Sequence, residues 1–142
     1  MKQFITNSDE ETRSFAEKFA KSFKGILALS GELGAGKTTF VQGFAKGLGI
    51  KDKIISPTFV LMRHHKIPKT KRTLHHIDLY RIEDPSSILN IGLEEIISNP
   101  QNIVVVEWAE KAKSILPENI TEIIIENTGK SSRKITVKDS LS

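Results

Sequence analysis

Eight residues at positions 31–38, GELGAGKT, combine three glycines with a lysine and a hydroxyl group, which are residue types suited to binding phosphate. Gly31, Gly36, Lys37 and Thr38 match the pattern G-x-x-x-x-G-K-[ST]. Glycine lets backbone N–H groups approach an anion, and the start of a helix adds further unpaired N–H groups. Lys37 would place its charge on the β and γ phosphates, and the hydroxyl of Thr38 can bind Mg²⁺. The predicted nucleotide-binding residues of this loop are Glu32, Leu33, Gly34, Ala35, Gly36, Lys37 and Thr38.

Two acidic residues at or near the ends of apolar runs are candidates for holding the metal and orienting water. Glu107 ends IVVVE (103–107), and Asp78 lies within HHIDLYR (75–81). In many proteins with such a loop, an acid at the end of a strand holds Mg²⁺, directly or through water. Another group orients the attacking water. The spacing does not assign the two roles. We therefore expect Lys37, Asp78 and Glu107 to be catalytic, with Thr38, Asp78 and Glu107 as the metal candidates.

The elements that must position these residues alternate between strands and helices. Apolar periodicity predicts helices over 9–23, 38–47, 84–97 (broken near Gly92) and 109–116. Strands are predicted over 26–30, 54–64, 72–82 and 103–108, and a hairpin over 120–127 and 133–139. This alternation favours an α/β fold whose sheet is parallel at its centre. We expect a three-layer P-loop NTPase domain over 1–142, with antiparallel strands at the edges of a mostly parallel sheet.

Composition narrows the class of protein further. The chain has 142 residues, a net charge of +4 and 0 cysteines. The length suggests one domain, and the missing cysteines exclude disulfides and thiolate chemistry. We read no signal peptide at the N-terminus, and the apolar runs are too short to cross a bilayer, so we expect a cytoplasmic protein with no membrane contact. The mild positive charge permits contact with nucleic acid or an acidic partner without requiring either.

Several motifs, taken in order, resemble one protein family over nearly the whole chain. They are GELGAGKTTF (31–40), SPTF (56–59), HIDLYR (76–81), IGLEE (91–95) and VEWAEK (106–111). The chain resembles the TsaE family, also called YjeE, which comprises bacterial P-loop ATPases needed to make threonylcarbamoyladenosine in tRNA. The resemblance implies hydrolysis of ATP with Mg²⁺. It also implies action on the TsaD–TsaB complex, whose turnover the ATP cycle sustains, with tRNA reached only indirectly or through that complex.

The same resemblance adds residues that the pattern alone does not provide. It places Thr39 near the α-phosphate, Thr58 in a switch-like segment near the γ-phosphate and Trp108 beside the nucleotide. It also places the segment from residue 6 to residue 12 near the base. The chain departs from the usual family pattern in VLMRHH (60–65) and in Ala109, where a proline is common. We expect the first of these departures to affect partner contacts and not nucleotide chemistry.

Other residues and functions remain as alternatives. Four histidines lie in two adjacent pairs, which suits a structural or partner-contact role better than a metal site because neighbours on a strand point to opposite faces. A basic loop (66–72) is either solvated or contacts the partners or tRNA, and Arg63, Arg72 and Arg81 are open candidates for a catalytic arginine. The missing N-K-x-D motif disfavours GTP. The alternative functions are a small-molecule kinase and a nucleotide-dependent binding module.

Overall fold

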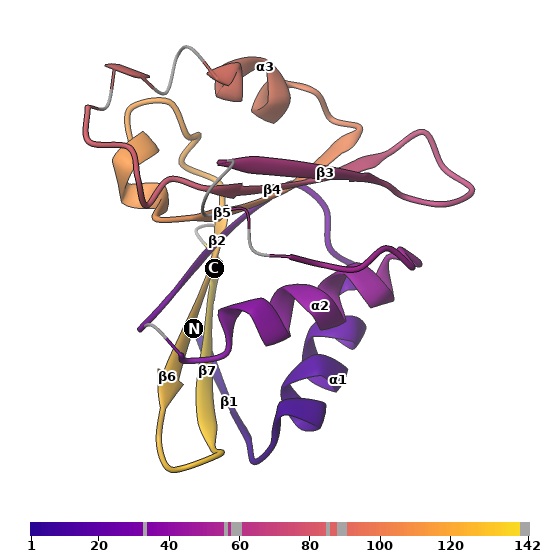
Figure 1. Ribbon diagram of the computed structural model, residues 1–142, viewed down its shortest axis with the longest axis vertical. Coiled ribbons are helices and arrows are strands. Elements are labelled where there is room, and N and C mark those ends of the chain that lie inside the picture. The colour runs from indigo at the N-terminus through magenta and orange to yellow at the C-terminus, as the bar shows by residue number, and fades with distance from the viewer. Residues whose placement is uncertain (33, 56, 58–60, 85, 88–90, 140–142) are drawn as a thin grey trace.

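A computed structural model of the chain describes residues 1–32, 34–55, 57, 61–84, 86–87 and 91–139. Its framework is a seven-stranded sheet in the order β1-β7-β6-β2-β5-β4-β3 (Figure 1). The strands are β1 (Lys2–Thr6), β2 (Ile26–Gly31), β3 (Met62–Lys66), β4 (Thr73–Asp78), β5 (Asn102–Glu107), β6 (Thr121–Asn127) and β7 (Arg133–Asp139). The helices are α1 (Asp9–Ala20), α2 (Lys37–Gly47), α3 (Leu93–Ser98) and the 3-10 helix η2 (Ala109–Ala112).

The sheet is parallel at its centre and antiparallel at both edges, as the sequence predicted. Strands β6, β2, β5 and β4 run parallel to one another. The edge pairs β3–β4, β6–β7 and β1–β7 are antiparallel. Because the central strands point the same way, the residues that follow β2, β4 and β5 lie together at the carboxyl ends of these strands. The candidate site lies at this end of the sheet.

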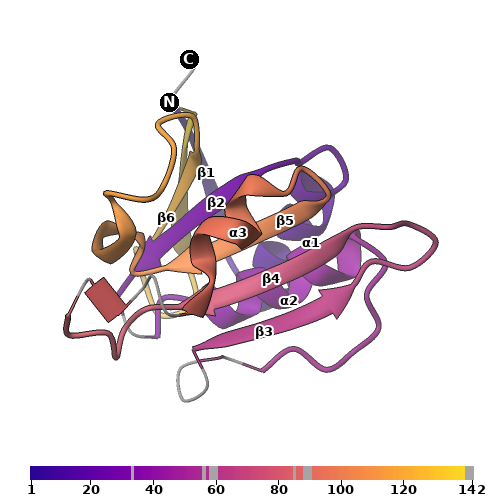
Figure 2. The same ribbon diagram turned by 90° about the horizontal axis from the view of Figure 1, so that it is seen from above.

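Helices cover both faces of the sheet and complete three layers. Figures 1 and 2 show α1 and α2 on one face, and α3 with the segment after β5 on the other. Each face has its own apolar core: Leu27 and Phe44 belong to the first, and Ile77 and Val106 to the second. The fold class predicted from the alternation of elements is therefore confirmed. Among the described residues, no helix combines the length and apolar character that crossing a membrane requires.

The two helices of the first face pack closely because α2 carries glycines where it meets α1. A Cβ at Gly43 would meet the carbonyl oxygen of Arg13 and lie 2.7 Å from its Cα, and one at Gly47 would lie 2.9 Å from the Cβ of Ala20. Phenylalanine rings fill the space beside this contact, with Phe19 and Phe44 centred 6.4 Å apart. Helix α2, which follows the loop after β2, is therefore anchored on a dense core.

Several predicted boundaries are wrong, each for a local reason. Helix α1 ends at Ala20 and not at residue 23, because the N–H groups of Lys21 and Phe23 turn to the carbonyls three residues back. The strand predicted over 72–82 ends at Asp78, whose carboxylate accepts the N–H of Tyr80 at 2.9 Å and closes a turn. The strand predicted over 54–64 is β3, which begins only at Met62.

The structure differs from the predicted elements in three further places. Of the helix predicted over 84–97, the structure describes α3, whose first residue follows Gly92 at φ +74°, and a 3-10 conformation at residues 86–87; residues 85 and 88–90 lie outside the described residues. The helix predicted over 109–116 is the short η2 followed by turns. Strand β1 was not predicted at all, because its five residues are mostly exposed and show no clear alternation. The C-terminal hairpin is confirmed.

Candidate nucleotide-binding site

The loop between β2 and α2 has the backbone that an anion-binding turn needs. Gly34 and Gly36 have φ of +79° and +100°, in the left-handed region that other residues rarely adopt. Gly31 serves a different purpose, since a Cβ there would lie 2.5 Å from the carbonyl oxygen of Ile125 on the neighbouring strand. Lys37 and Thr38 then begin α2, whose first N–H groups have no partner within the helix. The loop can therefore present N–H groups to an anion.

One hydrogen bond within the loop and one from Arg133 hold the loop in shape. The N–H of Ala35 donates to the carbonyl of Glu32 at 2.9 Å. The Nε of Arg133, at the start of β7, donates to the carbonyl of Ala35 at 2.9 Å, and its Nη1 donates to the carbonyl of Ser132 at 2.9 Å. Arg133 thus joins the C-terminal hairpin to the loop, although nothing in the sequence pattern marks it for that role.

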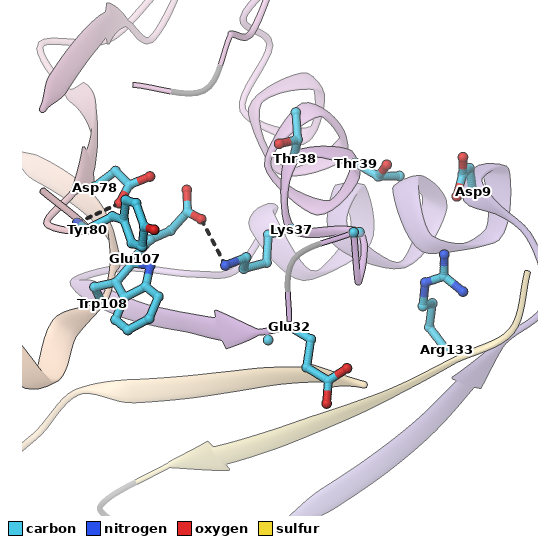
Figure 3. Close-up of a pocket in the computed structure, with 13 residues that line it drawn as sticks. Asp9, Glu32, Lys37, Thr38, Thr39, Asp78, Tyr80, Glu107, Trp108 and Arg133 are labelled. Carbon is cyan, nitrogen blue, oxygen red and sulfur yellow. Dashed lines mark hydrogen bonds and ion pairs between the residues drawn. The ribbon is translucent and has the colours of Figure 1, made fainter. Parts of the chain in front are cut away.

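The loop forms one side of a cleft of about 800 Å³. The first turn of α2, the ends of β4 and β5, Asp9 and Arg133 form the remainder (Figure 3). In this view Lys37 points toward Glu107, whereas the carboxylate of Glu32 points away from that pair. Thr38 and Thr39 line the cleft from the first turn of α2. A cleft of this volume is within the usual range for a small-molecule site.

The two candidate acids lie side by side at the ends of adjacent strands. Asp78 and Glu107 are direct register partners on the parallel strands β4 and β5, and both are buried, at 4% and 6% exposure. The Nζ of Lys37 lies 3.7 Å from Oε1 of Glu107, so the P-loop lysine and this acid form an ion pair across the cleft. The sequence predicted that these three residues act together, and the structure brings them together.

A histidine joins this cluster from the same strand as Asp78. The Nε2 of His76 lies 2.8 Å from Oε2 of Glu107, and His76 is 1% exposed. The remaining histidines of the two adjacent pairs lie elsewhere: His65 contacts Asp52 at 3.0 Å, and the rings of His64 and His75 are centred 5.4 Å apart. We expected a structural or partner-contact role for the histidines. Of the four, His76 contacts a candidate catalytic acid.

An aromatic pair forms the rim of the cleft. The rings of Tyr80 and Trp108 are centred 5.3 Å apart, and both side chains are partly exposed. Lys111 lies over both rings and donates to the carbonyls of Tyr80 and Ile82, at 2.7 and 2.8 Å. Trp108 itself has φ of +60°, an unusual conformation for a residue with a bulky side chain. The loops that follow the two acid-bearing strands are therefore tied to each other.

The predicted site residues fall into three groups. Most of them line the cleft: Glu32, Gly34, Gly36, Lys37, Thr38, Thr39, Asp78, Glu107 and Trp108. The side chain of Ala35 is buried in the core beneath the loop. Leu33 and Thr58 lie outside the described residues.

Sequence reasoning missed two residues of the cleft and indicated a third only loosely. Tyr80 lies in the quoted HIDLYR motif, yet we assigned it no role. Arg133 lies in a hairpin that we treated as purely structural, and no spacing rule connects it to a loop almost a hundred residues earlier. Asp9 falls in the segment expected near the base, which is fixed by a 2.7 Å hydrogen bond between the hydroxyls of Thr6 and Thr12.

The donor set suits a hard divalent cation bound together with phosphate. Asp78 and Glu107 supply carboxylate oxygens and Thr38 a hydroxyl, which are ligands that Mg²⁺ prefers. Within the described part of the chain, no three acidic or histidine side chains converge to hold an ion by themselves. Mg²⁺ commonly uses one or two protein ligands with substrate phosphates and water. These residues therefore fit a nucleotide-bound Mg²⁺.

The parallel sheet with this loop between its first central strand and the following helix defines the class of P-loop NTPase folds. Comparison with known proteins is more specific. The profile for "Threonylcarbamoyl adenosine biosynthesis protein TsaE" matches residues 6–135. The chain belongs to the TsaE family.

Relatives in several bacteria support this assignment. The chain is 43% identical over 124 residues to the tRNA threonylcarbamoyladenosine biosynthesis protein TsaE of Rickettsia bellii, covering 85% of this chain and 83% of that protein. It is 40% identical over 136 residues to the protein of the same name from Bacillus subtilis, covering 92% and 81%. The crystal structure of YdiB from Bacillus subtilis superimposes with a TM-score of 0.81 at 33% identity, covering 98% of this chain and 85% of that one. The chain thus belongs to a family that is named for the biosynthesis of threonylcarbamoyladenosine in tRNA.

Proposed function

We propose that this protein hydrolyses ATP with Mg²⁺ and that the hydrolysis sustains the turnover of a TsaD–TsaB complex during tRNA modification. The observation that carries the proposal is the Lys37–Glu107 ion pair across the cleft, beside Asp78. It places a phosphate-binding cation and two carboxylates around a space that a triphosphate can enter. The geometry suits transfer of the terminal phosphoryl group better than simple retention of a nucleotide.

The roles of the residues follow from this arrangement. The N–H groups of the loop and of the start of α2 bind the phosphates, and Lys37 contacts the β and γ phosphates. One acid would hold the metal and the other would orient a water molecule toward the γ-phosphorus. Attack by water forms one P–O bond and breaks the bond to the β-phosphate, which gives ADP and inorganic phosphate. When bound, Mg²⁺ neutralises charge on the phosphate oxygens.

The arginine content of the cleft supports a need for a partner. Of the described residues that line it, Arg133 is the one arginine, and its Nε and Nη1 already donate to backbone carbonyls. An arginine supplied in trans accelerates many P-loop enzymes by several powers of ten. We therefore propose that the isolated protein is slow and that the TsaD–TsaB complex completes the site.

Phosphate release by purified protein with ATP and Mg²⁺ tests the proposal. Lys37→Ala removes the charge on the phosphates and should lower turnover by at least roughly 100-fold, on the scale of losing one transition-state contact. Lys46→Ala is the matched control, because that lysine lies in the same helix with its Nζ 4.0 Å from Glu17 and its side chain exposed. Turnover unaffected by Lys37→Ala would contradict the proposal.

The products and the phenotype separate the alternatives. A small-molecule kinase would give a phosphorylated acceptor in place of free phosphate. For a nucleotide-dependent binding module, variants that bind ATP without hydrolysing it would still support tRNA modification. Either result would replace the ATPase assignment.

A further inference from the structure

The carboxylate of Glu107 is held from two sides, and the two contacts differ in kind. Its Oε1 lies 3.7 Å from Nζ of Lys37, which is an ion pair beyond hydrogen-bonding distance. Its Oε2 lies 2.8 Å from Nε2 of His76, which is a short and buried hydrogen bond. The directional contact that fixes the orientation of the carboxylate therefore comes from the histidine.

Binding of a triphosphate affects these two contacts differently. Under the proposed function Lys37 must turn to the phosphates, which weakens its attraction to Glu107 when the acid has to be in place. His76 has no such competing task. It lies two residues before Asp78 on β4, so both side chains project from the same face of the strand toward α2. The hydrogen bond from His76 can therefore persist as the lysine moves.

The chemistry of the contact assigns the proton on the imidazole ring. An ionised carboxylate only accepts hydrogen bonds, so with Glu107 in that form the hydrogen between the two groups belongs to Nε2 of His76. The other ring nitrogen, Nδ1, is buried and has no hydrogen-bond partner among the described residues. A ring with its hydrogen on Nε2 leaves a lone pair on Nδ1, and so avoids burying an unpaired N–H group.

We infer that His76 is a positioning residue that holds Glu107 in its working orientation once Lys37 has moved to the phosphates. This inference rests on the proposed function, and it assigns His76 no contact with nucleotide or water. Residues that orient a metal-ligating group commonly change metal affinity or activity by about 10- to 100-fold when replaced. His76 should therefore affect the Mg²⁺-dependent steps and leave metal-free nucleotide binding unchanged.

Three substitutions separate positioning from simple packing. In His76→Gln the amide nitrogen can reach the place of Nε2 and donate to Glu107. In His76→Asn the amide stops near the place of Nδ1, and His76→Leu fills the space without a donor. Turnover should fall roughly 10- to 100-fold for Asn and Leu and recover most of its value for Gln. His64→Asn on the neighbouring strand is the matched control for replacing an imidazole.

Two readouts do not depend on hydrolysis. Trp108 is the single tryptophan and directly follows Glu107, so its fluorescence can report Mg²⁺ binding in the presence of ADP. The Mg²⁺ concentration at half-maximal change should rise about 10-fold or more in His76→Asn but little in His76→Gln. In the wild-type protein, ¹⁵N NMR of the histidines should show hydrogen on Nε2 of His76.

The outcomes decide the inference separately from the proposed function. Equal losses in the Gln and Asn variants, unchanged Mg²⁺ dependence in Asn and Leu, or a ring with hydrogen on Nδ1 alone would each overturn it. If one variant fails to fold, the other pair and the NMR result on the wild-type protein still decide. Wild-type turnover no higher than that of Lys37→Ala would refute the proposed function, while fluorescence and NMR would still test the hold of His76 on Glu107.

Discussion

Glu107 has more contacts than the sequence could indicate. Its place after IVVV marks it as an acid at the end of a buried strand, and its proximity to Asp78 follows from parallel register. The His76 hydrogen bond depends on which way each side chain turns within the sheet, and the Lys37 ion pair depends on the path of the loop. Motifs therefore identify the acid, while its immediate neighbours require the folded chain.

Glu107→Gln should separate turnover from binding. The substitution keeps size and removes charge, so Mg²⁺-dependent phosphate release should fall by roughly 100-fold, as for other groups that act mainly in the transition state. Binding of metal-free nucleotide should be unchanged or tighter, because Lys37 no longer has to leave an ion pair. Phosphate release and the fluorescence of Trp108 measure the two effects. An equal loss of metal-free binding would contradict this role for the acid.

For the packing of elements, the α1–α2 contact gives a test in which the direction of the stability change is informative. Gly43→Ala would favour an isolated helix by about 0.8–1.0 kcal/mol. Here the new Cβ would meet the backbone of Arg13, which cannot move aside as a flexible side chain can. We expect a net loss of about 1–3 kcal/mol in the free energy of unfolding, measured by urea denaturation.

Gly129→Ala provides the control, since its nearest neighbours would lie 3.7 Å away in the hairpin loop. That variant should unfold close to the wild type. A Gly43→Ala protein more stable than the wild type would show that the helices lie farther apart than described here.

The pair β4–β5 gives a test against pH. Burial lowers the pKa of His75 below 6.5, a hydrogen bond with Asn102 opposes this, and nearby His64 adds to it. The unfolded chain therefore binds a proton at higher pH than the folded chain does, and stability should fall as pH drops below 6.5 toward the lowered pKa. His75→Gln should make this loss shallower between pH 7.5 and 5, as followed by urea midpoints. Identical pH slopes in both proteins would contradict the assignment.

Elements were predictable where apolar residues recur with a clear period, and less so where single polar contacts decide. The strand ILALS and the hairpin at the C-terminus follow from such patterns. The end of β4 depends on one hydrogen bond from the Tyr80 N–H to Asp78, which periodicity does not contain. Strand β1 depends on an available edge at β7, which only the folded sheet provides.

In the whole molecule, the candidate nucleotide site and the basic loop lie at opposite ends of β4. Asp78 ends the strand at the cleft, whereas Thr73 begins it beside the basic loop (66–72). A partner that completes the candidate site must therefore approach the carboxyl ends of the central strands, where the P-loop, Tyr80 and Trp108 lie. This arrangement makes the basic loop a surface separate from the cleft.

Addition of a TsaD–TsaB complex should raise the rate of ATP hydrolysis. An arginine supplied in trans would account for a gain of up to about 10³–10⁵-fold. Steady-state phosphate release with and without the complex measures the effect, and Lys37→Ala with the complex controls for contaminating ATPase. Fast turnover by the protein alone, unchanged by the complex, would contradict a site that a partner completes.

The most direct measurement is a crystal structure with a non-hydrolysable ATP analogue and Mg²⁺. We expect the phosphates within the loop of residues 31–38, with Nζ of Lys37 moved from Glu107 toward the β and γ phosphates. We also expect the metal between phosphate oxygens and at least one of Thr38, Asp78 and Glu107. A loop without phosphate, or both acids turned away from it, would contradict the proposed function.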